Sequence, residues 1–223
     1  MSKLARIITG AAALLLLAVF AAPLWRIHLT APQYPEGLGM QIRVKTIEGA
    51  GPTDLQNING LNHYIGMKAI EPGEIPVLTV MPWVLGALVA GGLLVAFVGR
   101  RGTLYAWVAA FAASGTLGLY EFWRWQYEYG HNLDPEAPIK IPGMAYQPPF
   151  IGSKDILNFT ATSWPGPGGI AAFLAFALAA VAAVVAFREG RQRTTVTTVP
   201  DSAVVAAAAA RVHAMAAAAA TAR

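Results

Sequence analysis

Histidine and methionine are the side chains of this sequence that could bind a metal ion. Asn59, His63 and Met67 follow one another at intervals of four residues, so a helix would place all three on one face. An imidazole nitrogen and a thioether sulfur with this spacing can bind a single ion. The same spacing also describes a solvated helix face that carries one incidental methionine, and both interpretations stay open on spacing alone.

The distribution of these residue types along the chain favours the metal interpretation. The chain has no cysteine, which excludes disulfides, thiolate metal sites and cysteine nucleophiles. The candidate ligands lie in two polar stretches and are His63, Met67, His28, Met40, His131 and Met144. Because imidazole and thioether together favour copper, and methionine favours Cu(I), we expect a copper site. Each of these residues alone could equally serve packing or an interface.

The composition explains what must position these residues. The chain of 223 residues is 56% hydrophobic and only 13% charged, whereas soluble domains contain about 25% charged residues. A helix needs roughly 20 apolar residues to cross a bilayer. Four stretches meet that requirement, at residues 7–25, 78–98, 103–123 and 168–187. The sequence therefore predicts an all-α integral membrane protein with four transmembrane helices and two long extracytoplasmic loops.

Basic residues predict the orientation of these spans. The N-terminus (in residues 1–25), the turn at 99–102 and the Ala-rich tail at 188–223 together hold nine Lys and Arg against two acids. We expect these segments in the cytoplasm and the loops at 26–77 and 124–167 in the periplasm, in the inner membrane of a bacterium. A cleaved signal peptide is the alternative for the first span, but its long apolar run favours an uncleaved anchor.

The first loop contains two predicted elements. Ile42 and Val44 alternate with Arg43 and Lys45, which is typical of a short, half-buried strand. Residues 53–67 are predicted to form an amphipathic helix. Its apolar stripe consists of Leu55, Ile58, Leu61 and Ile65.

The second loop begins with an aromatic and charged run. Glu121, Arg124 and Glu128 have helical spacing, which favours a self-paired set of charges on an extension of the third span. Glu121 near the membrane boundary could instead relay a proton or an ion.

The prolines that follow in the second loop exclude helix and favour extended backbone. They could hold Met144 in a fixed position, or offer a docking edge to another protein. The tryptophans expected in an interfacial belt are Trp25, Trp83, Trp123, Trp125 and Trp164.

Several functional classes find no support in the sequence. No phosphate-binding loop, HExxH, GxSxG or haem-attachment motif occurs, and no dense basic patch indicates nucleic-acid binding. We therefore expect no catalytic residues and no bound organic cofactor. An accessory or binding role is favoured over an enzyme.

Four strings suggest a relationship. They are LWRIHLTAPQYPEGLGMQI, DLQNINGLNHYIGMKAIEP, APIKIPGMAYQPPFIGSK and ILNFTATSWPGPGG. Across residues 24–170 the chain resembles a family of small bacterial membrane proteins that accompany nitrous oxide reductase maturation clusters and their copper lipoprotein chaperones. The resemblance implies a setting in copper-enzyme assembly, with the six His and Met residues above as candidate ligands.

Three functional hypotheses follow. The leading one is an inner-membrane accessory protein that binds or relays copper on its periplasmic face during maturation of a copper enzyme such as nitrous oxide reductase, with that enzyme or a copper chaperone as partner. The second is a membrane anchor, or an electron-transfer or quinol-interacting partner of a periplasmic redox enzyme. The third is a purely structural subunit of a membrane complex.

Overall fold

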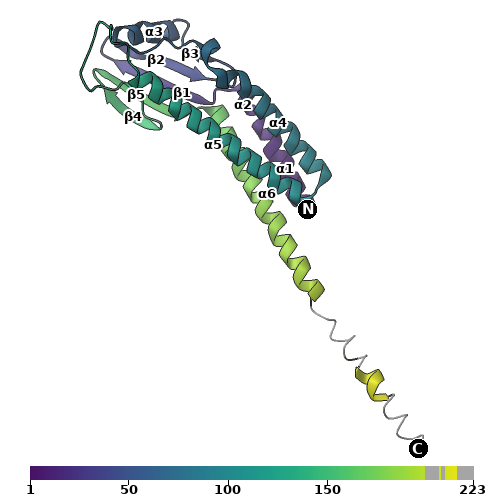
Figure 1. Ribbon diagram of the computed structural model, residues 1–223. Coiled ribbons are helices and arrows are strands. Elements are labelled where there is room, and N and C mark those ends of the chain that lie inside the picture. The colour runs from purple at the N-terminus through teal and green to yellow at the C-terminus, as the bar shows by residue number, and fades with distance from the viewer. Residues whose placement is uncertain (199–205, 207–208, 215–223) are drawn as a thin grey trace, which may run out of the picture.

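A helical bundle and a small domain with a β-sheet make up the protein (Figure 1). The computed structural model describes residues 1–198, 206 and 209–214, with only the backbone for 192–198. Half of the predicted Ala-rich tail at 188–223 therefore lies outside the described residues. The helices of the bundle are α1 (Lys3–Leu16), α2 (Ala18–Ala21), α4 (Pro76–Val98), α5 (Arg101–His131) and α6 (Pro167–Thr198).

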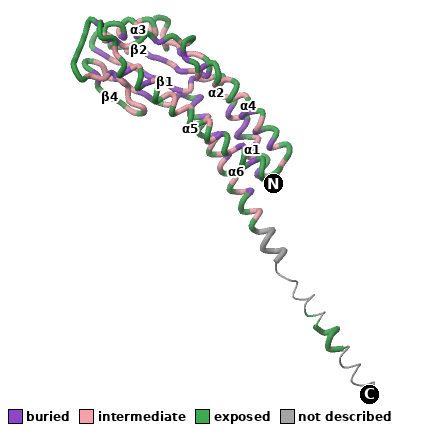
Figure 2. Tube along the Cα trace, in the orientation of Figure 1, coloured by how far each residue is buried: buried purple, intermediate pink, exposed green. Residues whose placement is uncertain are grey.

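Four segments of the described chain are long and apolar enough to cross a membrane. They are Lys3–Ala21, Pro76–Val98, Arg101–His131 and Pro167–Arg191. Their apolar side chains are exposed on the outside of the bundle, where lipid would cover them (Figure 2). The chain is therefore a multi-pass membrane protein.

Small residues hold the bundle together. Ala12 and Ala13 of α1 and Ala179 and Ala182 of α6 are fully buried, and α1 packs against both α4 and α6. Alanine at a helix contact lets two backbones approach closely, which is how helices associate in lipid. Trp107 of α5 donates a hydrogen bond from Nε1 to the Leu88 carbonyl oxygen of α4 at 2.8 Å. The bundle is thus closely packed, with α1 between α4 and α6 as its main contacts.

The two long loops fold together into one antiparallel sheet. Its strands are β1 (Trp25–Ala31), β2 (Tyr34–Ile42), β3 (Ile47–Gly49), β4 (Gly152–Ile156) and β5 (Phe159–Pro165). Their order is β3-β2-β1-β5-β4. The central pair joins the loops, because β1 of the first pairs with β5 of the second, from Trp25 opposite Pro165 to Thr30 opposite Thr160.

This sheet corrects the all-α prediction. The pairing of β1 with β5 joins segments more than a hundred residues apart, and no local pattern reveals such a pairing. The strand predicted to run through Ile42 and Val44 also ends earlier than expected. β2 ends at Ile42, and the chain then turns, with Arg43 N donating to the Thr46 carbonyl oxygen at 2.8 Å.

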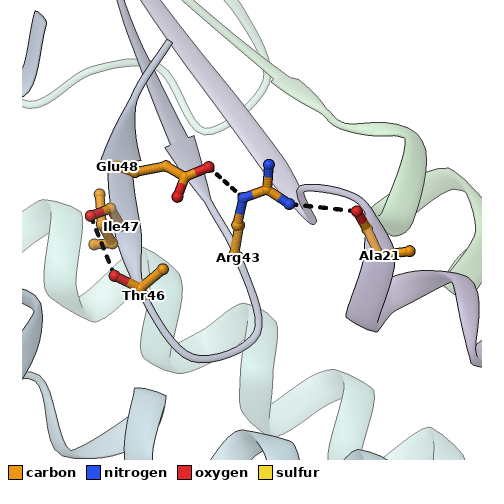
Figure 3. Close-up of polar contacts among 5 residues, drawn as sticks. All are labelled: Ala21, Arg43, Thr46, Ile47 and Glu48. Carbon is orange, nitrogen blue, oxygen red and sulfur yellow. Dashed lines mark hydrogen bonds and ion pairs between the residues drawn. The ribbon is translucent and has the colours of Figure 1, made fainter. Parts of the chain in front are cut away.

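The turn between β2 and β3 is fixed to the bundle. Arg43 forms an ion pair with Glu48 and also donates to the Ala21 carbonyl oxygen at the end of α2, at 3.4 Å (Figure 3). Val44, in the same turn, is buried in the hydrophobic cluster of the bundle. These contacts orient the sheet relative to the membrane helices.

Helix α3 (Asp54–Tyr64) covers one face of the sheet, and the short helix η1 (Pro72–Glu74) leads into α4. α3 is shorter than the predicted helix at 53–67. It ends at Tyr64, and Gly66 follows with φ +79°, a conformation that ends helices and suits glycine. The Asn59 side chain then pairs with both backbone groups of Ile70, at 2.8 and 3.2 Å. This pairing folds the chain back along the helix.

The long helix α5 connects the two parts. Its 31 residues correspond to roughly 46 Å at 1.5 Å per residue, whereas the apolar core of a bilayer is about 30 Å thick. The C-terminal part of α5 therefore extends beyond the apolar span, and it lies along the sheet (Figure 1).

Candidate functional site

A cavity of about 360 Å³ lies in the sheet domain. Its walls come from the sheet, α3, the end of α5 and the proline-rich segment between α5 and β4. Most of the lining is apolar.

Alternation along the strands creates the sheet wall. Ile27 and Leu29 of β1 point to the same face because side chains two apart in a strand share a face. Ile27 lies opposite Met40 of β2 in the register, and all three residues line the cavity. The apolar stripe predicted for the first-loop helix covers this wall, since Ile58 and Leu61 of α3 line the cavity too.

The proline-rich segment closes another side. It has neither helix nor strand between His131 and Gly152, in agreement with its prolines. Its backbone is nevertheless held, because Asp134 N donates to the Gly66 carbonyl oxygen at 2.8 Å and Ile139 N to that of Tyr64 at 2.9 Å. Tyr146 N donates to the Gly130 carbonyl oxygen at 2.9 Å, which places the Tyr146 side chain in the wall.

Three of the polar residues that line the cavity have buried side-chain atoms without a partner. In the described part of the chain, four buried side-chain polar atoms lack a hydrogen bond: Trp125 Nε1, Tyr146 OH, and both Nε2 and Oε1 of Gln126. All three residues line this cavity. Gln126 is only 1% exposed, so its amide is buried in the wall.

Unpaired buried polar atoms are costly. An unsatisfied buried donor or acceptor costs about 1–3 kcal/mol, and native proteins contain few of them. Their concentration around one cavity indicates that a bound molecule or internal water completes their hydrogen bonds. The arrangement suits an uncharged ligand, because none of the described residues that line the cavity is Asp, Glu, Lys, Arg or His.

The methionines among the predicted metal ligands lie near this cavity. Met40 and Met67 line it from β2 and from the segment after α3. Met144 packs in the same hydrophobic cluster as Met67, beside Tyr146 and Ile156. The structure thus brings three thioethers to one region of the domain.

The predicted histidines lie elsewhere. His28 is on the opposite face of the sheet from Ile27, with its ring over Gly37, where an added Cβ would be 2.1 Å from Nε2. His63 is exposed on α3. His131 is exposed at the end of α5, where its ring stacks on Tyr127 at 4.0 Å between centroids.

One geometric assumption behind the metal prediction is wrong. His63 and Met67 do not share a helix face, because α3 ends at Tyr64 and Met67 follows the glycine turn. Within the described residues, no group of three or more His, Asp or Glu side chains is placed to hold a metal ion.

The sequence analysis missed Gln126 and Tyr146 and placed Trp125 in the interfacial belt. A signal was present, since Gln126 lies four residues after Phe122 and three before Tyr129, on the apolar side of an otherwise polar helix end. Trp25 was also assigned to the belt. It is buried instead, and its Nε1 donates to Ser163 Oγ at 2.8 Å.

The fold and the cavity define a class: a multi-pass membrane protein whose loops build a small domain with an antiparallel sheet and a helix around a cavity of ligand size. Comparison of the chain with protein-family models and with curated proteins found no match. The residues of the cavity are therefore the basis for a functional proposal.

Proposed function

We propose that the protein is an accessory protein of a bacterial inner membrane whose two loops form a periplasmic module that binds a small molecule. The observation that supports this most directly is the unpaired Gln126 amide in the cavity wall. Ligand sites are typically cavities of about 300–1,000 Å³ with apolar walls and a few convergent polar groups. The cavity of about 360 Å³ meets both criteria.

A binding role fits the lining better than catalysis. General acid–base catalysis most often uses His, Asp or Glu, and none of these is among the described residues that line the cavity. The walls can surround, orient and desolvate a neutral molecule. The membrane helices then keep the module at the surface of the bilayer, where lipid-soluble molecules and periplasmic proteins meet.

The test is the small-molecule content of the purified full-length protein. Detergent-purified protein would be extracted with solvent and the extract analysed by mass spectrometry, with Gln126→Leu and Gln56→Leu in parallel. Gln56 is exposed on α3, so it offers the same substitution away from the cavity. We expect a molecule near one equivalent in the wild type and in Gln56→Leu, and its loss in Gln126→Leu. Equal content in all three proteins would contradict the proposal.

A second candidate function is copper binding during assembly of a copper enzyme, such as nitrous oxide reductase. It is favoured by the thioethers of Met40 and Met67 on the cavity wall and of Met144 beside them, because thioethers in apolar surroundings suit Cu(I). A copper chaperone or the copper enzyme itself would then be the partner. The resemblance of residues 24–170 to proteins of this setting supports the same proposal.

Copper analysis separates the candidate ligands. Protein loaded with Cu(I) under reducing conditions and desalted would be measured beside Met67→Leu/Met144→Leu and His63→Ala. Near-stoichiometric copper that is lost only in the methionine variant would support a thioether site. Loss in His63→Ala would support the His63 pairing expected from the sequence, and copper-free protein throughout would contradict the copper function.

A further inference from the structure

We infer that the cavity binds a neutral hydroxyaromatic head group, of the phenol or hydroquinone class. This inference rests on the proposed binding function and names the chemical class of the ligand. It is carried by the types of unpaired atoms in the wall, by the aromatic lining and by the absence of charge among the described lining residues.

The unpaired atoms specify what the ligand must donate and accept. Trp125 Nε1 can only donate, and Gln126 Oε1 can only accept, whereas the Tyr146 hydroxyl does both. A ligand that completes the Trp125 and Gln126 atoms must therefore carry both an acceptor and a donor. A hydroxyl group provides the two together. A quinone has only carbonyl acceptors, so it leaves Gln126 Oε1 without a donor.

The shape and chemistry of the wall favour an aromatic ring. Trp125, Tyr129, Tyr146 and Phe159 line the cavity, and the rings of Trp125 and Tyr129 lie 4.9 Å apart with a tilt of 45°. Aromatic rings prefer offset and tilted neighbours at 4.5–7 Å, which such side chains can offer to a flat ligand. A carboxylate, phosphate or ammonium would enter without a charged partner in the wall, at a high desolvation cost.

The rim of the cavity suits an apolar substituent on that ring. Tyr64, Ile139 and Leu157 line the cavity and are also 45–55% exposed. A large exposed apolar side chain is ordinary when it stands alone, but a group around one opening indicates a contact site. The head group would lie among Trp125, Gln126 and Tyr146, and an alkyl chain would cross the rim. A membrane quinol has this form, and a free phenol has the head group alone.

Binding of matched reduced and oxidised probes tests the inference. The full-length protein in detergent would be titrated with decylubiquinol under reducing conditions, with decylubiquinone, and with the same benzoquinol head group lacking the decyl chain. Bound probe would be measured by equilibrium dialysis. We expect the quinol to bind about 5-fold or more tightly than the quinone, since an unpaired buried acceptor costs about 1–3 kcal/mol.

Variants connect that preference to the cavity. Gln126→Leu should reduce the ratio of quinol to quinone affinity to near one, and Tyr146→Phe should weaken both probes. Gln56→Leu should match the wild type. Equal affinity for quinol and quinone in the wild type, or a preference that persists in Gln126→Leu, would overturn the inference. Thermal unfolding of each variant confirms that it is folded.

The outcomes distinguish this inference from the broader function. A Gln126-dependent molecule that co-purifies from cells, together with no binding of either benzoquinol, would overturn the hydroxyaromatic class and leave the binding function standing. If no molecule co-purifies and neither benzoquinol binds, the binding function and the hydroxyaromatic class are both overturned. Within a positive result, tighter binding of the decyl probe than of the bare head group identifies a membrane quinol, and equal binding identifies a free phenol as the source.

Discussion

The membrane bundle and the sheet domain differ in that unpaired buried polar side chains occur, among the described residues, only in the sheet domain. In the bundle, the buried Thr9 hydroxyl donates to the Ala5 carbonyl oxygen at 2.7 Å, and Trp107 Nε1 has its partner in Leu88. In the described part of the sheet domain, Trp125 Nε1, the Gln126 amide and the Tyr146 hydroxyl are buried without partners around a cavity. Since both parts belong to one chain, the unpaired groups are a local feature, which supports the ligand site proposed above.

The two parts also differ in how tightly they are packed. A Cβ added to Gly92 in α4 would lie 2.6 Å from the Trp107 ring and 2.8 Å from Ala13. The bundle therefore has no room for an extra methyl group at this contact, whereas the sheet domain contains an open cavity. Four predictions follow from the differences between the two parts, from the largest expected effect to the smallest.

The largest effect is expected where the two parts join. A Cβ on Gly169, at the start of α6, would lie 2.2 Å from the Leu24 carbonyl oxygen before β1. Since that neighbour is backbone, Gly169→Ala must shift the junction, and we expect a loss of about 3 kcal/mol or more in unfolding free energy. Thermal unfolding in detergent measures it.

Gly86→Ala is the matched control, because nothing lies within 4 Å of an added Cβ there. Alanine is the better helix former by up to about 1 kcal/mol, so this variant should be unchanged or slightly more stable. If both alanine variants unfold alike, the close contact at Gly169 does not determine the junction.

The membrane part could be predicted from the sequence because its signal is local. Apolar runs such as residues 78–98 identify a span without knowledge of any partner, and the structure has α4 at Pro76–Val98. The amphipathic stripe of α3 was visible for the same reason, since Ile58 and Leu61 follow helical spacing.

The sheet and the cavity could not be predicted in this way. Thr30 and Thr160 pair across the two loops, and a pairing between distant segments leaves no periodic signal. The His63 and Met67 geometry failed because one glycine, Gly66, ends the helix earlier than the apolar stripe does. Gln126 was missed because its burial depends on a sheet that the sequence did not reveal.

The next-largest effect is expected when a larger side chain is introduced into the bundle, compared with one introduced next to the cavity. Ala179 of α6 is fully buried, so Ala179→Leu should cost about 1–3 kcal/mol or more through overpacking. Leu61→Phe adds volume next to the cavity and should cost less than about 1 kcal/mol, because the side chain has space to enter. Val181→Leu, on the exposed side of α6, is the control for the bundle. Equal losses for Ala179→Leu and Leu61→Phe would contradict the contrast in packing.

A smaller effect, of opposite sign, is expected at the unpaired amide. Gln126→Leu removes two unsatisfied polar atoms, so the ligand-free protein should gain about 1–2 kcal/mol in unfolding free energy. Decylubiquinol should then stabilise the wild type, by RT ln(1 + [L]/Kd), and stabilise the variant less, because the variant binds it more weakly. The measurement is thermal unfolding with and without decylubiquinol, and Gln56→Leu is the control. A destabilised Gln126→Leu would show that internal hydrogen bonds already satisfy this amide.

The smallest effect is expected at the ion pair between Glu121 and Arg124, which lies at 3.0 Å on successive turns of α5. The side chains are 34% and 52% exposed, and an exposed helical pair contributes about 0.3–0.5 kcal/mol. Glu121→Gln should therefore change the unfolding free energy by less than about 0.5 kcal/mol in water-accessible surroundings.

The same measurement in lipid bilayers shows where this turn of α5 lies relative to the membrane, because an unpaired Arg124 within the apolar core would cost about 2.5 kcal/mol or more. A negligible loss in both media places the turn in the interface, so that α5 leaves the lipid before Trp125 and Gln126 and the cavity lies outside the membrane. A large loss confined to bilayers would place Glu121 within lipid and revive its alternative role as a relay, which a proton-flux measurement on reconstituted protein would then examine.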